Sequence, residues 1–197
     1  MIAHIVKSLA RPFRRFARAN EAVAVIEFAL VMPVMLMLYL GSVELSQAIN
    51  VDQRITNISA TVGDLVAREK NVIPASDLAD YFQAAKAILA PYTTSGLLQT
   101  VSLVYVNSSG VTNVRWTQAN GGASTQIVGQ PWAGLHPIPT SMIAISHSNW
   151  IIVSEAAYAY QPLVIGMFLK APMPLYHQTF YLPRFASIIC YDTTPCT

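Results

Sequence analysis

The stretch of sequence that decides the fold is AVAVIEFALVMPVMLMLYLGSV, residues 22–43, in which Glu27 is the only charged residue. As an α-helix this stretch would be about 33 Å long at about 1.5 Å per residue. The hydrocarbon core of a bilayer is roughly 30 Å thick, so the stretch is long enough to cross it. We therefore predict a transmembrane helix over residues 23–43.

The charges on the two sides of this helix differ. Residues 44–197 hold seven basic and eight acidic side chains, so this part is nearly neutral and offers no basic groove for nucleic acid. By the positive-inside rule, the basic leader of residues 1–22 lies in the cytoplasm and the rest of the chain lies outside. The basic side chains of the leader are Lys7, Arg11, Arg14, Arg15 and Arg18.

A cleaved secretory signal is the alternative interpretation of the N-terminal region. Ser46-Gln47-Ala48 loosely satisfies the small-x-small pattern of a signal cleavage site. The apolar cores of signal peptides are about 7–15 residues long, and the present apolar run is longer. A transmembrane anchor is therefore favoured over a released protein that begins at Ile49.

The helical pattern continues beyond the membrane segment. Over residues 44–70 apolar side chains recur at alternating spacings of three and four, which predicts an amphipathic extension of the same helix. Pro33 lacks a backbone N–H and is expected to kink the helix inside the membrane, and Gly63 weakens its helical propensity. The members of the apolar stripe are Ala48, Val51, Ile55, Ile58, Val62 and Leu65.

The remaining residues, 71–197, are expected to form an α+β head. Before Pro91, apolar side chains recur at helical spacing, which predicts a helix that ends at this proline. Residues 100–118 are predicted to form two strands of a β-hairpin, with Asn107-Ser108-Ser109-Gly110 as the turn. A longer strand is expected from Asn149. Residues 176–190 are expected to supply one more strand or two short ones, and Pro183, which cannot donate to a sheet, restricts this segment to an edge or a break. The fold class is thus a long N-terminal helix with a small head built on an antiparallel sheet of three or four strands.

The sequence contains no pattern that points to an enzyme or a metal site. The head has His136, His147 and His177 in unrelated contexts, and it lacks the motifs of serine hydrolases and phosphate-binding loops. Cys190 and Cys196 are too few for a zinc site, but in an oxidising compartment they could form a disulfide; two unpaired thiols are the alternative. We expect no metal, no cofactor and no catalytic activity.

The anchor and its flanks resemble the TadE/TadG-like proteins of the tight-adherence (Flp, type IVc) pilus assembly system. The likeness is carried by NEAVAVIEFALVMPVMLMLYLGSVELSQA, which fits a family pattern of a Glu-Phe pair followed by Ala-Leu and Pro in the helix. Two shorter likenesses lie in the head, at Tyr158 to Leu163 and at Pro183-Arg184. The resemblance implies a pilin-like layout.

The resemblance also implies processing by a prepilin peptidase, with the scissile bond between Ala22 and Val23. Family members usually have Gly where this sequence has Ala22. Cleavage there would make Glu27 the fifth residue of the mature protein, where pilin-like proteins carry a glutamate as the partner of a neighbouring N-terminal amine. The alternative for Glu27 is that its side chain extends to the cytoplasmic headgroups and pairs with Arg18.

The function that the resemblance implies is that of a minor pilin or pseudopilin in tight-adherence pilus biogenesis. Its partners would be the prepilin peptidase, other pilin-like subunits, pilus assembly proteins and the lipid bilayer. It would sit in the bacterial inner membrane with its head in the periplasm. The alternatives are an unprocessed, membrane-tethered scaffold of the pilus apparatus and, less favoured, a membrane-anchored periplasmic enzyme.

Overall fold

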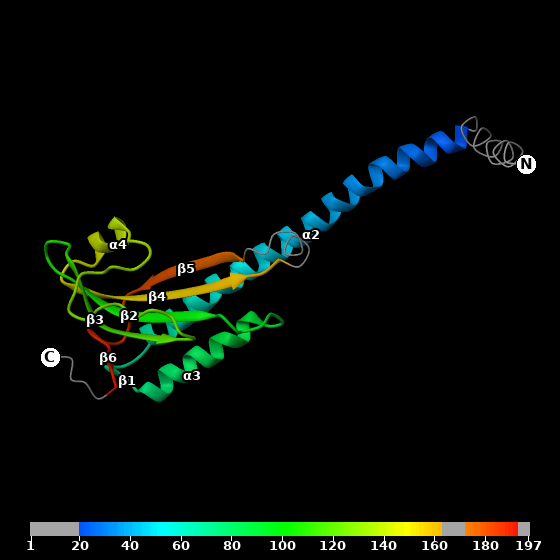
Figure 1. Ribbon diagram of the computed structural model, residues 1–197. Coiled ribbons are helices and arrows are strands. Elements are labelled where there is room, and N and C mark those ends of the chain that lie inside the picture. Colours follow the sequence, from blue (N-terminus) through cyan, green and yellow to red (C-terminus); the bar gives the residue numbers. More distant parts are fainter. Residues whose placement is uncertain (1–19, 163–171, 193–197) are drawn as a thin grey trace, which may run out of the picture.

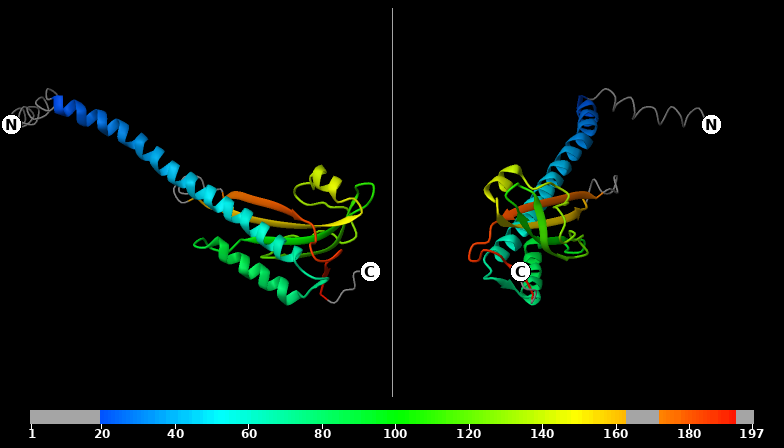
Figure 2. Two further views of the ribbon diagram at one scale, coloured as in Figure 1. Left: turned by 180° about the vertical axis from the view of Figure 1, so that it is seen from behind. Right: turned by 90° about the vertical axis from the view of Figure 1, so that its left-hand side faces the viewer.

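The longest element of the protein is helix α2, Asn20–Ala67, which has 48 residues. The computed structural model describes residues 20–162 and 172–192. The first half of α2 projects away from the head, and its second half lies along one face of a sheet (Figures 1 and 2). The predicted fold class, a long N-terminal helix that continues into an α+β head with an antiparallel sheet, is therefore confirmed.

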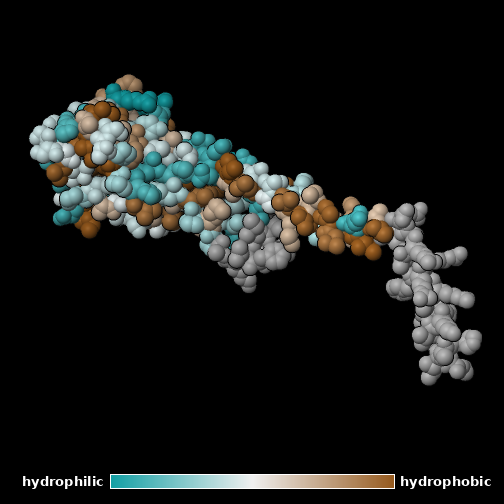
Figure 3. Space-filling model, turned by 90° about the horizontal axis from the view of Figure 1, so that it is seen from above, coloured by the Kyte–Doolittle hydropathy of each residue, from teal (hydrophilic) through white to brown (hydrophobic). Residues whose placement is uncertain are grey.

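The projecting half of α2 exposes apolar side chains all around. Every side chain from Val23 to Tyr39 is exposed, and the most apolar 18-residue window of the helix has no buried residue. Figure 3 shows this part covered mainly by hydrophobic residues, whereas the surface of the head is mixed. Exposure of an apolar surface of this extent to water is unfavourable, and the length and composition of the helix suit a lipid bilayer. The helix runs on through Pro33, and the kink expected there stays a prediction.

The second half of α2 buries one stripe against the head. Val51, Ile55 and Ile58 are fully buried, whereas Leu65, which the spacing of the sequence placed on this stripe, is only partly buried. Val66 is buried instead, because 18 residues make five turns at 3.6 residues per turn, so that Val66 lies on the same side of the helix as Ala48.

Four antiparallel strands form the sheet that α2 covers. The strands are β2 (Leu98–Val106), β3 (Thr112–Asn120), β4 (Asn149–Tyr160) and β5 (Met173–Tyr181). Their order in the sheet is β3-β2-β4-β5. The predicted hairpin is present as β2 and β3, whose pairing contains an irregularity between Leu103 and Val104. Helix α2 packs mainly on β4 and β5.

Smaller elements complete the head. Helix α3 (Ala75–Lys86) and the 3-10 turn η1 (Ala87–Leu89) contact α2 beside the sheet. Strands β1 (Val72–Ile73) and β6 (Cys190–Tyr191) pair in parallel, and helix α4 spans Thr140–Ile145. The sequence did not predict β1, β6 or α4, because elements of two to six residues are too short to show a period.

The segment after β5 returns across the end of α2. The Arg184 backbone N–H donates to the Ala67 carbonyl at 2.9 Å, and the indole N–H of Trp116 donates to the Ile189 carbonyl at 2.7 Å. Cys190 lies in β6, where its backbone N–H donates to the Asn71 carbonyl at 2.6 Å. The other cysteine, Cys196, and the apolar run 163–169 lie outside the described residues, so the disulfide between Cys190 and Cys196 stays a prediction.

Gly63 allows α2 to lie close to the sheet. A Cβ atom at this position would stand 2.7 Å from the Tyr181 ring, closer than real Cβ atoms approach other atoms, and 3.1 Å from the Cβ of Ser154, closer than most such contacts. The glycine that weakens the helix in isolation is therefore required where α2 crosses β4 and β5.

We predict that Gly63→Ala destabilises the head. Overpacking costs about 1–3 kcal/mol, while the better helix propensity of alanine returns at most about 1 kcal/mol. The measurement is thermal unfolding of the detergent-solubilised chain, followed by the fluorescence of Trp116, Trp132 and Trp150, which all lie in the head.

The matched control is Gly41→Ala in the same helix, where an added Cβ meets nothing within 4 Å. This variant should leave the unfolding temperature of the head unchanged. A Gly63→Ala protein as stable as its Gly41→Ala counterpart would contradict the packing account.

Candidate functional site

Glu27 is the charged residue within the apolar stretch of α2, residues 23–43. Its neighbours one turn away on the same face are Val23 and Val31, and both are about half exposed. Within the described part of the chain, Glu27 makes no hydrogen bond or ion pair. A carboxylate in hydrocarbon costs several kcal/mol unless it is neutralised or paired, so this position needs a partner when the helix is in the membrane.

The predicted cleavage site lies in the first turn of α2. The helix begins at Asn20, so the bond between Ala22 and Val23 falls three residues into it. Arg18, the alternative partner of Glu27, lies outside the described residues. The arrangement around Glu27 therefore leaves both predicted partners, Arg18 and a neighbouring amine, as predictions.

The exposed apolar surface of α2 continues past the membrane segment. Glu44 is buried against the head, with 5% of its surface exposed. Leu45 and Ile49 are 62% and 50% exposed and lie one turn apart on the flank of the helix, about 100° around its axis from the buried Glu44 and Ala48. The helix therefore presents an apolar contact surface in line with the membrane segment and to one side of the head.

Polar contacts fix the orientation of α2 on the head. The Arg54 guanidinium donates to the carbonyl oxygens of Ile88 and Ala90, both at 2.6 Å, and lies over the Tyr92 ring. Nε2 of His177 in β5 lies 2.7 Å from Oδ1 of Asp52. These contacts join α2 to η1 and to β5.

A further ion pair lies near the end of α2. Asp64 accepts from Arg184 at 2.7 Å and from Arg68 at 2.5 Å. Arg184 belongs to the Pro183-Arg184 pair that the sequence singled out, and its ion pair together with its backbone bond to Ala67 holds the returning segment on the helix.

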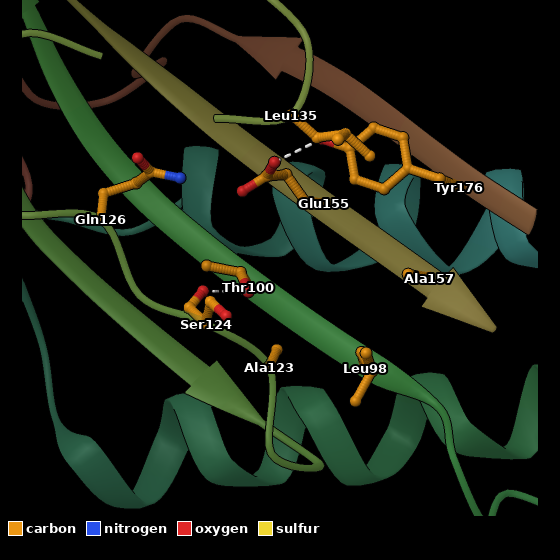
Figure 4. A pocket seen from close by; sticks show the side chains of 9 residues that line it. All are labelled: Leu98, Thr100, Ala123, Ser124, Gln126, Leu135, Glu155, Ala157 and Tyr176. Carbon is orange, nitrogen blue, oxygen red and sulfur yellow. Dashed lines mark hydrogen bonds between the residues drawn. The ribbon is translucent and has the colours of Figure 1, made fainter. Parts of the chain in front are cut away.

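A pocket of about 250 Å³ lies on the face of the sheet opposite to α2. Figure 4 shows it between strands β2, β4 and β5 and the loop that follows β3, with the helices behind the sheet. The residues that line it are Leu98, Thr100, Ala123, Ser124, Gln126, Leu135, Glu155, Ala157 and Tyr176.

Glu155 is the charged side chain that lines this pocket. Only 9% of its surface is exposed, and the Tyr176 hydroxyl donates a hydrogen bond to Oε1. Burial raises the pKa of Glu155, while the Tyr176 hydrogen bond and the nearby His136 oppose this rise. Burial and the contact with Glu155 likewise raise the pKa of Tyr176.

Buried polar groups surround Glu155. Gln178, its partner across the strand pair β4–β5, has a buried side-chain nitrogen without a hydrogen-bond partner in the described residues. Thr100, its partner on β2, donates from its hydroxyl to the Ser124 carbonyl in the covering loop at 3.3 Å. The centre of this face is therefore polar, whereas residues such as Val104, Val153 and Ile151 make its other end apolar.

Sequence reasoning did not find this pocket. One signal for it was present in the sequence, because Glu155 is the only acidic residue in the four long strands. The residues around Glu155 could not be predicted, since Gln126 and Leu135 come from a loop whose path over the sheet has no sequence pattern. Among residues 20–162 and 172–192, no three His, Cys, Asp or Glu side chains are grouped so that they could hold a metal.

Comparison with known proteins bears on the helix and not on the pocket. The family model of TadE-like proteins matches residues 22–63, which confirms the resemblance seen in the sequence over the anchor and its extension. Neither the comparison with curated proteins nor that with solved structures gave a match. The TadE-like match supports a component associated with the tight-adherence pilus, from a family of structural components and not of enzymes.

We predict that Glu155→Gln stabilises the head at neutral pH and much less at acidic pH. A carboxyl with a raised pKa in the folded state favours folding when it is protonated, and this stability is lost as the pH rises through its folded pKa. The amide removes a buried charge that forms no ion pair among the described residues, and its oxygen can still accept from Tyr176, so a gain of about 1 kcal/mol is expected at pH 7.5.

The measurement is the unfolding temperature of both proteins between pH 4 and pH 8. The difference between them should grow as the pH rises. A difference that grows as the pH falls would show that the Glu155 carboxylate is stabilised by the fold and would contradict this prediction.

Proposed function

We propose that this chain, with its TadE-like residues 22–63, is a minor pilin or pseudopilin of the tight-adherence pilus. The observation that carries the proposal is the single helix α2, which exposes an apolar stretch, residues 23–43, with one carboxylate, Glu27, and packs its second half on a folded head. Such a protein acts by association, since its exposed helix can exchange lipid for the helices of neighbouring subunits.

Glu27 sets the register of this association. After cleavage between Ala22 and Val23, the new α-amine of Val23 on one subunit pairs with the Glu27 carboxylate of the next. The pairing offsets the cost of placing either charge in an apolar surrounding. It also selects one axial position, because a subunit displaced along the bundle leaves both charges without partners.

The exposed pair Leu45 and Ile49 extends the association surface out of the membrane. These exposed side chains lie on α2 beyond Val43 and to one side of the head, so the helix of a neighbouring subunit can contact them. The contacts of Arg54 and Asp52 with the head keep this face turned outward. We place the leader in the cytoplasm, α2 across the inner membrane and the head in the periplasm, as the positive-inside rule favours.

An unprocessed scaffold of the pilus apparatus is the second candidate. Ala22 stands where the family pattern has Gly at the cleavage site, and this departure favours a chain that keeps its leader. Such a scaffold would use the same head, and the membrane helix would serve only as a tether.

We predict that the protein isolated from membranes of piliated cells begins at Val23. Intact mass and N-terminal sequencing measure this directly, and an Ala22→Gly variant provides the comparison with the usual family residue. A start at Val23 in both proteins supports prepilin-type processing. A wild-type start at Met1, with a start at Val23 only in Ala22→Gly, favours the scaffold, and a start at Ile49 would contradict an anchor of either kind.

We also predict that Glu27→Gln abolishes the contribution of this protein to pilus formation while leaving its level in the membrane unchanged. The amide cannot pair with an amine by charge, whereas Glu27→Asp keeps the charge and should retain partial function. The measurement is pilus number per cell beside the amount of protein in isolated membranes. Normal piliation with Glu27→Gln would show that α2 is only a tether.

A further inference from the structure

The pocket on the face of the sheet opposite to α2 holds a buried negative charge. Among residues 20–162 and 172–192, Glu155 is the charged residue in its lining and no Lys or Arg lines it, while His136 lies near enough to act on the Glu155 carboxylate. A buried carboxylate without an opposite charge lowers the stability of the fold. The fold nevertheless shapes the covering loop around this group, and the residues beside it carry further oxygen acceptors.

We propose that this pocket binds a primary ammonium group on a slim alkyl stem, the group that ends a lysine side chain. An ammonium carries three N–H donors and no acceptor. Three residues from different elements that line the pocket carry oxygen acceptors: Glu155 in β4 has a carboxylate, Thr100 in β2 a hydroxyl and Gln126 in the loop a side-chain amide. Figure 4 shows the side chains of these residues in the space between loop and sheet.

The walls of the pocket suit the apolar stem of such a group. Leu98 and Ala157 lie on the sheet side, and Leu135 is 72% exposed in the covering loop. A charged head with methylene groups behind it therefore meets oxygens at one end and hydrocarbon at the other. The volume of about 250 Å³ is small for a drug-sized ligand but sufficient for one side chain.

A guanidinium group or a metal ion fits these residues less well. A guanidinium pairs best with both oxygens of one carboxylate, but Oε1 of Glu155 already accepts from Tyr176. A calcium ion requires six to eight oxygen ligands, and the pocket supplies a single carboxylate. The three donors of an ammonium match the acceptors that are available.

The position of the pocket favours a protein or a free amine over a lipid headgroup as the source. The strands beneath it lie level with Asp52, which contacts His177 next to Tyr176 in β5. Asp52 is nine residues beyond Val43, about 14 Å along the helix. The headgroup region on each side of the hydrocarbon core is only about 5–8 Å thick, so an amine-headed lipid does not reach this level.

The experiment follows the side-chain carboxyl carbon of Glu155 by NMR in the full-length, detergent-solubilised protein with ¹³C-labelled glutamate. The chain contains five glutamates, and the Glu155→Gln variant identifies the resonance of Glu155. The probes are n-butylammonium chloride, the neutral isostere 1-butanol and N-acetyl-lysine methylamide. Glu69, which accepts from Tyr81 in the same head, serves as the internal control.

We expect n-butylammonium to shift the Glu155 resonance saturably and to leave the Glu69 resonance in place. 1-Butanol should bind with less than a tenth of the affinity of n-butylammonium. In Glu155→Gln, which we expect to fold stably, the probe should no longer raise the unfolding temperature. An equal response to the blocked lysine indicates a protein partner, and a response to n-butylammonium alone indicates a free amine.

A linear drift of both the Glu155 and Glu69 resonances, or equal binding of 1-butanol, would overturn the proposal. The proposal does not rest on a role in the pilus. The binding test uses the isolated protein, so a failure to bind n-butylammonium would leave the pilus role of α2 unaffected. Binding of n-butylammonium would likewise support the pocket proposal even if Glu27→Gln did not reduce piliation.

Discussion

One constraint governs the structure: helix α2 must satisfy two environments along a single rod. Its first half exposes apolar side chains all around and requires lipid or other helices. Its second half buries a single stripe, from Ala48 to Val66, on the sheet. A helix of this kind cannot be removed from the head, because its stripe supplies one wall of the core. Whatever holds the apolar half therefore also determines where the head stands.

The head offers two faces with different tasks. The face toward α2 is apolar and closely packed, with Gly63 setting the distance between helix and sheet. The opposite face is divided between an apolar end and a polar centre around Glu155, covered by the loop that follows β3. A buried carboxylate there does not contribute to the stability of the fold, and groups of this kind are commonly found at binding sites.

Much of this fold follows from periodicity. The apolar run over residues 22–43, the stripe on α2 and the alternation around Asn107 each extend over enough residues to show their period, and the structure has the corresponding elements. The stripe ends at Val66 instead of Leu65, because an α-helix drifts from a strict heptad. Strands β1 and β6 and the pocket depend on contacts between residues far apart in sequence, such as Glu155 with Tyr176 and Trp116 with Ile189, and no local pattern encodes those contacts.

The most direct test of the account is a cysteine accessibility scan of α2 in intact inner-membrane vesicles, with Cys190 and Cys196 replaced by serine. Single cysteines at residues 30–40 should be protected from a membrane-impermeant maleimide. Cysteines at the exposed, polar positions Asn50, Gln53 and Asn57 should be labelled from the periplasmic side. Labelling along the whole helix would contradict the claim that the first half of α2 lies in lipid while its second half packs on the head.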